Sequence, residues 1–339
     1  DLDKAIRRQR QMCIRDRLWG PRDECPDENG MRLRDSQCGL FATGKVLRRF
    51  GIPFTYLKNC NLEDECFAEG IDRFLRVCNV VKAFRNTRVL QISTRPFDFW
   101  STMCNEGELL EKFGIQLSPI PMPELTQAMK DVKENSPEEI KEVTDYCREK
   151  MCIKVTPEQL DNVAALKIAM TRLGKKYGCN CGAIQCWNAL QDEIGIMPCA
   201  ANALCNDEGF PIACEIDIHG TITSVLVEAA AMGETRSFFA DWTVRHPYND
   251  NAELLQHCGP WPISIAKEKP TIDTPVAFDC SGSLMAQAKD GEHISLVRFD
   301  GDNGEYSLLL GNAKTVDGPY TKGTYTVSYT HLTLPTNSL

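Results

Sequence analysis

Two short runs of mostly branched apolar residues, 89–93 and 115–120, flank a segment that carries the signals of a helix. Asn105 and Glu108 have the spacing of a capping box, which satisfies free backbone N–H groups in the first turn of a helix. Gly114 stands where a helix commonly ends in a left-handed residue. A strand, a helix and a second strand in this order indicate a βαβ unit with parallel strands. The middle of the chain is therefore predicted to be α/β.

The same alternation extends to both sides of this unit. Residues 38–50 have apolar side chains at helical spacing, and residues 52–57 follow as a short strand. Ser136 and Thr156 each precede a proline and have Glu or Gln three positions further on, which predicts two more capped helices. The second of these helices is expected to end at Gly178.

Beyond about Gly233 the pattern favours strands. Segments 293–299 and 306–311 alternate between apolar and polar residues, and residues 300–304 between them contain an Asn-Gly pair typical of a hairpin. The predicted fold class is therefore α/β, with a parallel-sheet α/β domain followed by a truncated β-rich C-terminal domain.

Residues 7–16 and 327–336 are related through DNA rather than as protein. One back-translation of 327–336 has a reverse complement that reads RRQRQMCIRD, the sequence of residues 7–16. This word resembles the adaptor of transposase-based sequencing libraries, so we exclude both flanks from the fold prediction and expect the chain to be an inactive, poorly stable fragment. The predicted divisions are 1–17 adaptor-derived, 18–35 the remnant of a first α/β domain, 36–232 the middle α/β domain, 233–326 the truncated β-rich domain and 327–339 adaptor-derived.

Charge and hydropathy exclude several classes of partner. The formal net charge of -9 argues against nucleic-acid binding. The chain contains no apolar run long enough to cross a bilayer and does not open with a signal peptide, so no membrane partner is expected. Its 17 cysteines fall within apolar segments, which suits buried thiols in a reducing compartment and predicts a cytoplasmic location. Nucleotide-binding and serine-hydrolase motifs do not occur.

Two acidic residues, Glu215 and Asp241, each follow a short apolar run that is predicted to be a strand, with a helix expected over 221–232. Such acids are often solvated or cap a helix. Glu215, however, lies among apolar neighbours, where an unpaired carboxylate is costly and a cation-binding one is not. Two carboxylates and the imidazole of His257 would suit Mn²⁺ or a similar divalent ion. A lone histidine is more often structural than a ligand, and His219 could take the place of His257.

Other residues in this region have two interpretations each. Six cysteines lie between 179 and 214, but their spacing matches neither zinc-finger nor ferredoxin patterns, so packing in the core is favoured over a metal cluster. Trp242, beside Asp241, could stack on a sugar or simply belong to the core.

The segments 213–217 and 239–242 resemble the metal-site region of the L-fucose isomerase and L-arabinose isomerase superfamily, closest to its fucose-isomerase-like branch. Segments 105–110, 190–199 and 206–209 strengthen the resemblance. It implies two α/β domains and a β-rich C-terminal domain, assembled as a homo-oligomer, either a trimer or a hexamer. The implied reaction interconverts an aldose and a ketose through an enediol, with Mn²⁺ as the usual cofactor.

The resemblance also implies roles for individual residues. Glu215 and Asp241 match the two acidic metal ligands, which serve as the acid/base pair, and His257 matches a metal ligand of the arabinose branch. Gln185 and Trp242 are the candidates for sugar binding. The family's last metal-binding histidine lies beyond residue 326, and His331, in the adaptor-derived flank, is not counted as that ligand.

Alternatives to an ordinary sugar isomerase stay open. The same fold could isomerise a modified sugar such as a sulfonated hexose, for which Arg95 or Arg245 would be a candidate anion-binding residue. The chain could also be a non-catalytic sugar-binding relative or a cysteine-ligated metalloprotein.

Overall fold

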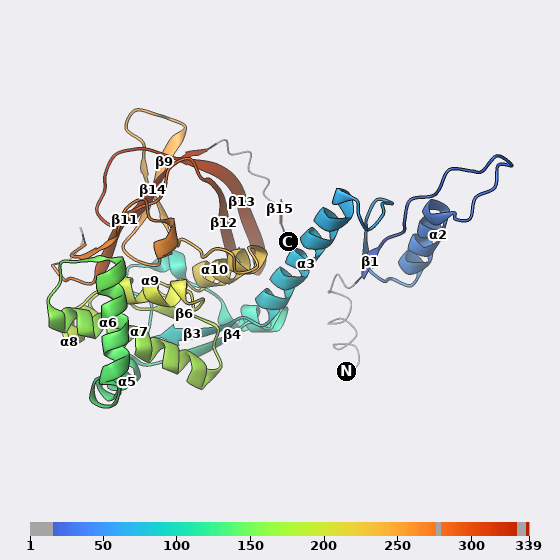
Figure 1. Ribbon diagram of the computed structural model, residues 1–339. Helices are drawn as coiled ribbons and strands as arrows, with labels where there is room; N and C mark the ends of the chain where they lie inside the picture. The colour runs from blue at the N-terminus through green and yellow to red at the C-terminus, as the bar shows by residue number, and fades with distance from the viewer. Residues whose placement is uncertain (1–15, 276–278, 331–336, 339) are drawn as a thin grey trace. The chain divides into compact units, whose positions relative to one another are not determined.

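The computed structural model describes residues 16–275, 279–330 and 337–338 (Figure 1). The chain divides into two compact units. Unit 1 contains the described residues up to Ala83 together with 229–232, and unit 2 contains the described residues of 84–228 and of the chain from Gly233 onward. The predicted boundary between 35 and 36 falls inside unit 1. The physical reason is strand pairing, because β1 (Asp16–Leu18) forms a parallel pair with β2 (Phe54–Tyr56) across that boundary.

Unit 1 has few elements. Besides β1 and β2 it contains α2 (Ser36–Arg49) and most of α3 (Glu65–Arg85). The predicted helix 38–50 and strand 52–57 are confirmed, each within two or three residues. The edge of Trp19 packs against Phe67, with ring centroids 5.1 Å apart, and joins the loop after β1 to α3.

The centre of unit 2 is a four-stranded parallel sheet, which confirms the α/β prediction. Its spatial order is β4–β3–β6–β7, and all neighbours are parallel. The strands are β3 (Arg88–Ile92), β4 (Gln116–Ile120), β6 (Cys181–Ile184) and β7 (Ile212–Ala213).

Helices cover both faces of this sheet. They are η1 (Trp100–Thr102), α4 (Glu106–Glu108), η2 (Leu109–Phe113), α5 (Met122–Asn135), α6 (Pro137–Lys150), α7 (Pro157–Tyr177), α8 (Ala189–Ile194), α9 (Cys199–Asp207) and α10 (Ile218–Ala230). Leu90 and Ile92 belong to the core shared with α5, α6 and α7, whereas Val89 belongs to the core shared with α10. This alternation is the two-residue period of a strand that is buried on both sides.

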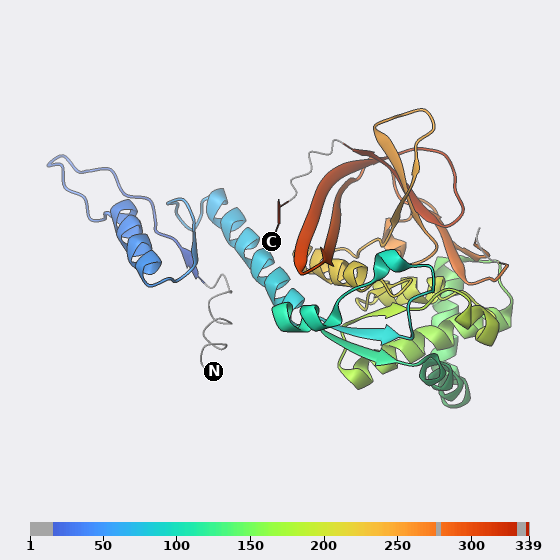
Figure 2. The ribbon, with the colours of Figure 1, turned by 180° about the vertical axis from the view of Figure 1, so that it is seen from behind.

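A second, strand-rich sheet lies on the α10 side of unit 2. Its strands are β5 (Cys152–Ile153), β8 (Asp241–Arg245), β9 (Ala252–His257), β10 (Thr271–Asp273), β11 (Ser283–Gln287), β12 (His293–Asp302), β13 (Glu305–Val316), β14 (Thr324–Thr330) and β15 (Asn337–Ser338). Figures 1 and 2 show α9 and α10 between the two sheets. Thr221 of α10 donates a hydrogen bond to Gly182 O, while Thr223 accepts one from Phe299 N on β12.

The predicted hairpin is confirmed in β12 and β13. Asp302 pairs with Glu305, and both turn residues, Asn303 and Gly304, have positive φ as a tight hairpin turn requires. The sheet is not confined to the predicted C-terminal domain, because β5, from between α6 and α7, pairs with β10.

Strand β14 continues through Thr330 into the flank predicted to be adaptor-derived. Val327 in this strand is fully buried and pairs with Leu254 of β9. Residues 1–15 and 331–336, and with them His331, lie outside the described residues. Among the described helices, none combines the length and apolar character of a membrane span.

Candidate active site

Glu215 lies just beyond the carboxyl end of β7, where parallel sheets commonly place ligand-binding residues. As predicted, Glu215 follows a strand, because β7 ends at Ala213, and a sharp turn comes next. Glu215 and Ile216 have φ of 54° and 56°, in the left-handed region that is uncommon for a branched residue such as isoleucine. Strain of this kind persists only where surrounding contacts enforce it.

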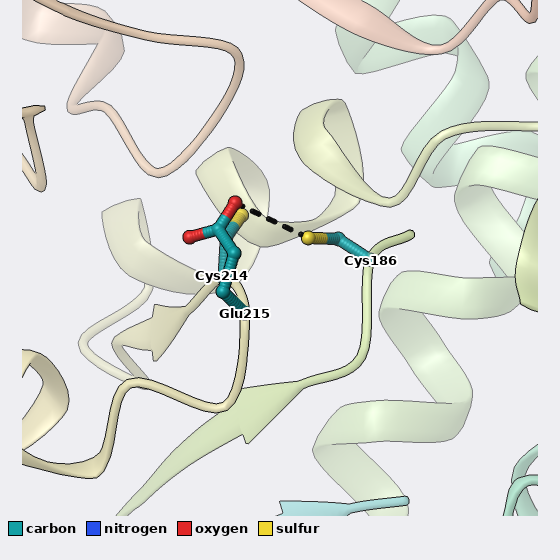
Figure 3. A group of neighbouring side chains, drawn as sticks. All are labelled: Cys186, Cys214 and Glu215. Carbon is teal, nitrogen blue, oxygen red and sulfur yellow. Dashed lines mark hydrogen bonds between the residues drawn. The ribbon is translucent and has the colours of Figure 1, made fainter. Parts of the chain in front are cut away.

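Those contacts hold both the backbone and the carboxylate of Glu215. Thr102 Oγ1 donates to Glu215 O at 3.2 Å, and Ile216 N donates to Ile184 O at 3.3 Å. The thiol of Cys186, which follows β6, donates to Glu215 Oε1 at 3.3 Å (Figure 3). The turn therefore presents the carboxylate in a fixed direction.

Asp241 and His257 come from the antiparallel pair β8 and β9. Asp241 is the first residue of β8 and not, as predicted, the residue after a strand. The preceding apolar run is irregular because Phe238 packs on Trp261 and Phe239 N bonds to Pro260 O instead of joining a ladder. Asp241 pairs with Gln256, the neighbour of His257, so the register brings the two predicted ligands together.

The side chains of Glu215, Asp241 and His257 converge as the sequence predicts. His257 Nε2 lies 3.5 Å from Glu215 Oε2 and 4.0 Å from Asp241 Oδ2. The side chains of His257 and Glu215 are 5% and 12% exposed, whereas that of Asp241 is 70% exposed. The group is thus buried on the His257 side and open to solvent at Asp241. The roles assigned to the three residues stay predictions.

Electrostatics couple these groups. Burial alone lowers the pKa of His257, but contact with Glu215 and the charges of Glu215 and Asp241 outweigh it and raise that pKa to about 9. Without a cation the imidazole is therefore protonated at neutral pH. Loss of solvent raises the pKa of Asp241 above its usual value, an effect that its solvent exposure partly screens.

His257 Nε2 lies within 4.0 Å of a carboxylate oxygen of each acid. Ligand atoms from all three residues do not lie within 4.8 Å of one another, so the two acids would have to move closer together to share one ion. Two carboxylates and an imidazole are donors that Mn²⁺ and similar ions accept. A cation would also replace the proton that His257 otherwise carries between two acids.

The two predicted sugar-binding residues, Trp242 and Gln185, have different surroundings. Trp242 follows Asp241 on β8 and is 47% exposed, so it is not a core residue. Gln185 follows β6 and its Oε1 accepts a hydrogen bond from Ser93 Oγ at 2.8 Å, which joins the carboxyl ends of β3 and β6. Their role in sugar binding stays a prediction.

The basic and histidine alternatives have other partners. Arg95, after β3, donates to the carbonyls of Pro96 and Phe97. Arg245 lies 3.9 Å from Glu253 and has a 70% exposed side chain. His219 Nδ1 lies 2.9 Å from Asp300 Oδ1, so this imidazole is paired with Asp300.

Sequence reasoning missed the thiols that surround Glu215. Cys186 contacts its carboxylate, and Cys214 precedes it and lies beside both Cys186 and Cys199. Burial raises the pKa of Cys186 to about 11. One sequence signal could have predicted that these thiols lie together, since Cys186 follows one strand and Cys214 follows the parallel strand beside it.

Sequence reasoning also missed an ion pair. Arg298 on β12 binds both carboxylate oxygens of Asp217, two residues after Glu215. Asp217 Oδ1 also accepts from Gly220 N at 2.9 Å. This pair ties the turn that carries Glu215 to the strand-rich sheet.

Comparison with known proteins relates the chain to a family of sugar isomerases. Residues 17–85 match the model of the fucose/sulfoquinovose isomerase N-terminal domain. A sulfoquinovose isomerase of Alkalicoccus urumqiensis is 25% identical over 305 residues, which is 89% of this chain and 67% of the relative. The sulfoquinovose isomerase of Priestia megaterium is 24% identical over 90% of this chain and 67% of its own length.

Over most of its length the chain is similar to members of the fucose/sulfoquinovose isomerase superfamily. The match to its relatives runs through both units, since it covers far more than residues 17–85. The chain spans about two thirds of the length of these relatives. These similarities support an aldose–ketose isomerase, as the resemblance in the sequence implies.

Proposed function

We propose that the chain is part of a Mn²⁺-dependent isomerase that interconverts sulfoquinovose and the corresponding sulfonated ketose. The observation that carries the proposal is the convergence of Glu215, Asp241 and His257 in a chain similar over most of its length to sulfoquinovose isomerases. Sulfoquinovose is favoured over L-fucose or L-arabinose because four similar relatives are sulfoquinovose isomerases.

The reaction needs a proton to move between C1 and C2 of the sugar. A bound divalent ion would supply stabilisation of the negative charge that develops on the sugar oxygens. Glu215 is proposed to remove and return the proton, because its carboxylate is held in place by Cys186 on one side and His257 on the other. Asp241 faces solvent and is proposed as the second acid/base group, at the side from which a sugar could enter.

Recognition of the sugar is proposed to involve Gln185 and Trp242. The exposed face of Trp242 can stack on a sugar ring, and the amide of Gln185 can bond to hydroxyl groups. Arg95 is the preferred candidate for the sulfonate, because it follows β3 at the same edge of the sheet as Glu215. Arg245 is a weaker candidate, because it lies four residues along β8 from Asp241 and beside Glu253.

A sugar panel tests this proposal. The longer parent protein that the sequence predicts is freed of metal and given Mn²⁺ and then sulfoquinovose, glucose, L-fucose or L-arabinose, and ketose formation is followed by NMR. We expect conversion of sulfoquinovose that is at least tenfold faster than that of the neutral sugars. Faster conversion of L-fucose or L-arabinose would overturn the sulfonated substrate in favour of the ordinary sugar isomerase.

Metal binding is measured in parallel, because it is informative at any level of turnover. Free Mn²⁺ is counted by electron paramagnetic resonance with the parent chain, Asp241→Asn and the control Asp192→Asn, an exposed acid of α8. We expect Asp241→Asn to weaken Mn²⁺ binding at least tenfold and the control to leave it unchanged. Equal binding by all three proteins would exclude Asp241 as a ligand.

A cytoplasmic location and a homo-oligomer, a trimer or hexamer, are part of the same proposal. Cys186, Cys199 and Cys214 are neighbouring free thiols, and a reducing compartment would keep them so. A monomer in light-scattering measurements would contradict the assembly.

A further inference from the structure

Two thiols and one carboxylate form a compact group at the carboxyl ends of two adjacent parallel strands. Cys186 follows β6, while Cys214 and Glu215 follow β7. The Sγ atoms of both cysteines and a carboxylate oxygen of Glu215 all lie within 4.8 Å of one another. In Figure 3 the three side chains point toward a common centre.

The spacing of these atoms suits a small cation with soft ligands. Ligands at about 2.3 Å from a tetrahedral Zn²⁺ stand roughly 3.8 Å apart, and Cys186 Sγ lies 3.3 Å from Glu215 Oε1. Sulfur donors favour Zn²⁺ and similar thiophilic ions, whereas Mn²⁺ prefers oxygen and imidazole. This group therefore differs in chemistry from the group formed by Glu215, Asp241 and His257.

A buried amide supplies a second, independent observation. Asn202 of α9 is fully buried, its Nδ2 lies 3.5 Å from Cys214 Sγ, and its Oδ1 has no hydrogen-bond partner among the described residues. Asn202 Nδ2 donates to Cys214 Sγ, while the unpartnered Oδ1 costs free energy that a bond to a neutral thiol offsets only weakly. The same N–H···S bond is stronger when the sulfur is a metal-bound thiolate, because the acceptor is then charged.

We propose that Cys186, Cys214 and Glu215 form a site for a thiophilic divalent cation such as Zn²⁺. The site uses Glu215 Oε1, whereas Oε2 of the same carboxylate faces His257. A bound cation deprotonates the thiols that coordinate it, and a water completes the fourth position. The inference shares Glu215 with the proposed isomerase site but does not depend on the isomerase being active.

Cobalt absorption tests the site directly. The full chain, reduced with a phosphine and freed of metal, is titrated with Co²⁺, and the thiolate-to-cobalt charge-transfer band in the near ultraviolet is recorded. We expect a band that saturates with bound Co²⁺ and disappears when Zn²⁺ is added. Cys186→Ala and Cys214→Ala should each lose most of it, while Cys205→Ala, a buried cysteine of α9 that contacts Lys167 O and Thr171, should retain it.

The outcomes separate this proposal from the isomerase proposal. Asp241→Asn should keep the cobalt band and lose Mn²⁺ binding, because Asp241 is not part of the thiol group. A parent chain without the band, or a band equally strong in Cys186→Ala and Cys214→Ala, overturns the thiophilic site whatever the isomerase assay shows. Thermal unfolding of both variants checks that they fold. If Cys214→Ala does not fold, the cobalt band of Cys186→Ala alone decides whether the thiol site exists.

Discussion

At the scale of single residues, the two oxygens of Glu215 face different chemistry. One accepts a hydrogen bond from the thiol of Cys186, and the other faces the imidazole of His257. The left-handed backbone at Glu215 and Ile216 makes this orientation possible at a cost of about 1–3 kcal/mol per residue. A carboxylate fixed from both sides loses little entropy when it takes up a proton or a cation.

A second buried acid makes stability depend on pH. Asp207 ends α9, and both of its carboxylate oxygens accept from Ile263 N. Burial raises the pKa of Asp207 to about 6. The folded state therefore holds this proton more tightly than the unfolded state, whose pKa is about 4, so the free energy of unfolding falls as pH rises between these values.

Asp207→Asn removes that pH dependence and keeps an oxygen to accept from Ile263 N. We expect the variant to gain about 1 kcal/mol over the parent chain at pH 8, after allowance for solvent screening, and less at pH 5. Urea unfolding at both values measures the difference, with Asp192→Asn at an exposed position as the control. A gain that is the same at pH 5 and pH 8 would contradict the assignment.

Sequence reasoning at this scale identified residue types and not their partners. Glu215 is recognisable because it is an acid among apolar residues, and the resemblance adds Asp241 and His257. The contact between Cys186 and Glu215 is not visible in local sequence, because 29 residues separate the two and only the pairing of β6 with β7 brings them together. A cysteine in an apolar segment carries the same signal whether it packs or binds.

At the scale of elements, identical signals for a helix start led to different structures. The predicted capping box at Thr156 is confirmed. Thr156 Oγ1 accepts from Gln159 N at 3.2 Å, and Gln159 Oε1 accepts from Thr156 N at 3.0 Å. The capping box predicted at Ser136 is wrong, although α6 does begin there. Arg172 Nη2 of α7 donates a hydrogen bond to Ser136 Oγ at 2.8 Å, so a tertiary contact replaces the cap that the local sequence predicts.

Thr156 and Ser136, at the starts of α7 and α6, allow a matched pair of mutations. Thr156→Ala should cost about 1 kcal/mol of unfolding free energy, because it removes a side-chain cap. Ser136→Ala should cost less than half as much, because Ser136 makes no capping bond and Arg172 keeps its pairing with Glu139. Urea unfolding of the two variants decides the point, and equal losses would contradict this interpretation of the two helix starts.

Strand prediction failed where packing competes with pairing. The apolar residues before Asp241 have the composition of a strand, but Phe238 and Phe239 are used against Trp261 and His257 instead. Strong local patterns, as in 88–92, 116–120 and the hairpin of β12 and β13, were predicted within a few residues.

At the scale of the whole molecule, strand pairing decides the organisation. Parallel pairing of β1 with β2 keeps residues 16–56 within unit 1. The first segment of that unit ends at Ala83, close to residue 85, where the match to the N-terminal domain model ends. Pairing of β5 with β10 joins the α/β region to the strand-rich sheet. Neither contact is visible in local sequence, because both partners are short and distant along the chain.

Within unit 2, the proposed site draws on both sheets. Glu215 comes from the parallel sheet, Asp241 and His257 come from the strand-rich sheet, and Arg298 ties the two together through Asp217. In the proposed reaction, these residues and a divalent ion together move a proton on a sulfonated sugar.

Conversion of sulfoquinovose in D₂O by the longer parent protein tests this proton transfer most directly, with the ketose followed by NMR for solvent deuterium at the carbon that receives the proton. With Mn²⁺ present, we predict a ketose that carries deuterium, little conversion in EDTA, and a rate at least about 100-fold lower for Glu215→Gln. Conversion that proceeds undiminished in EDTA or in Glu215→Gln would contradict the account.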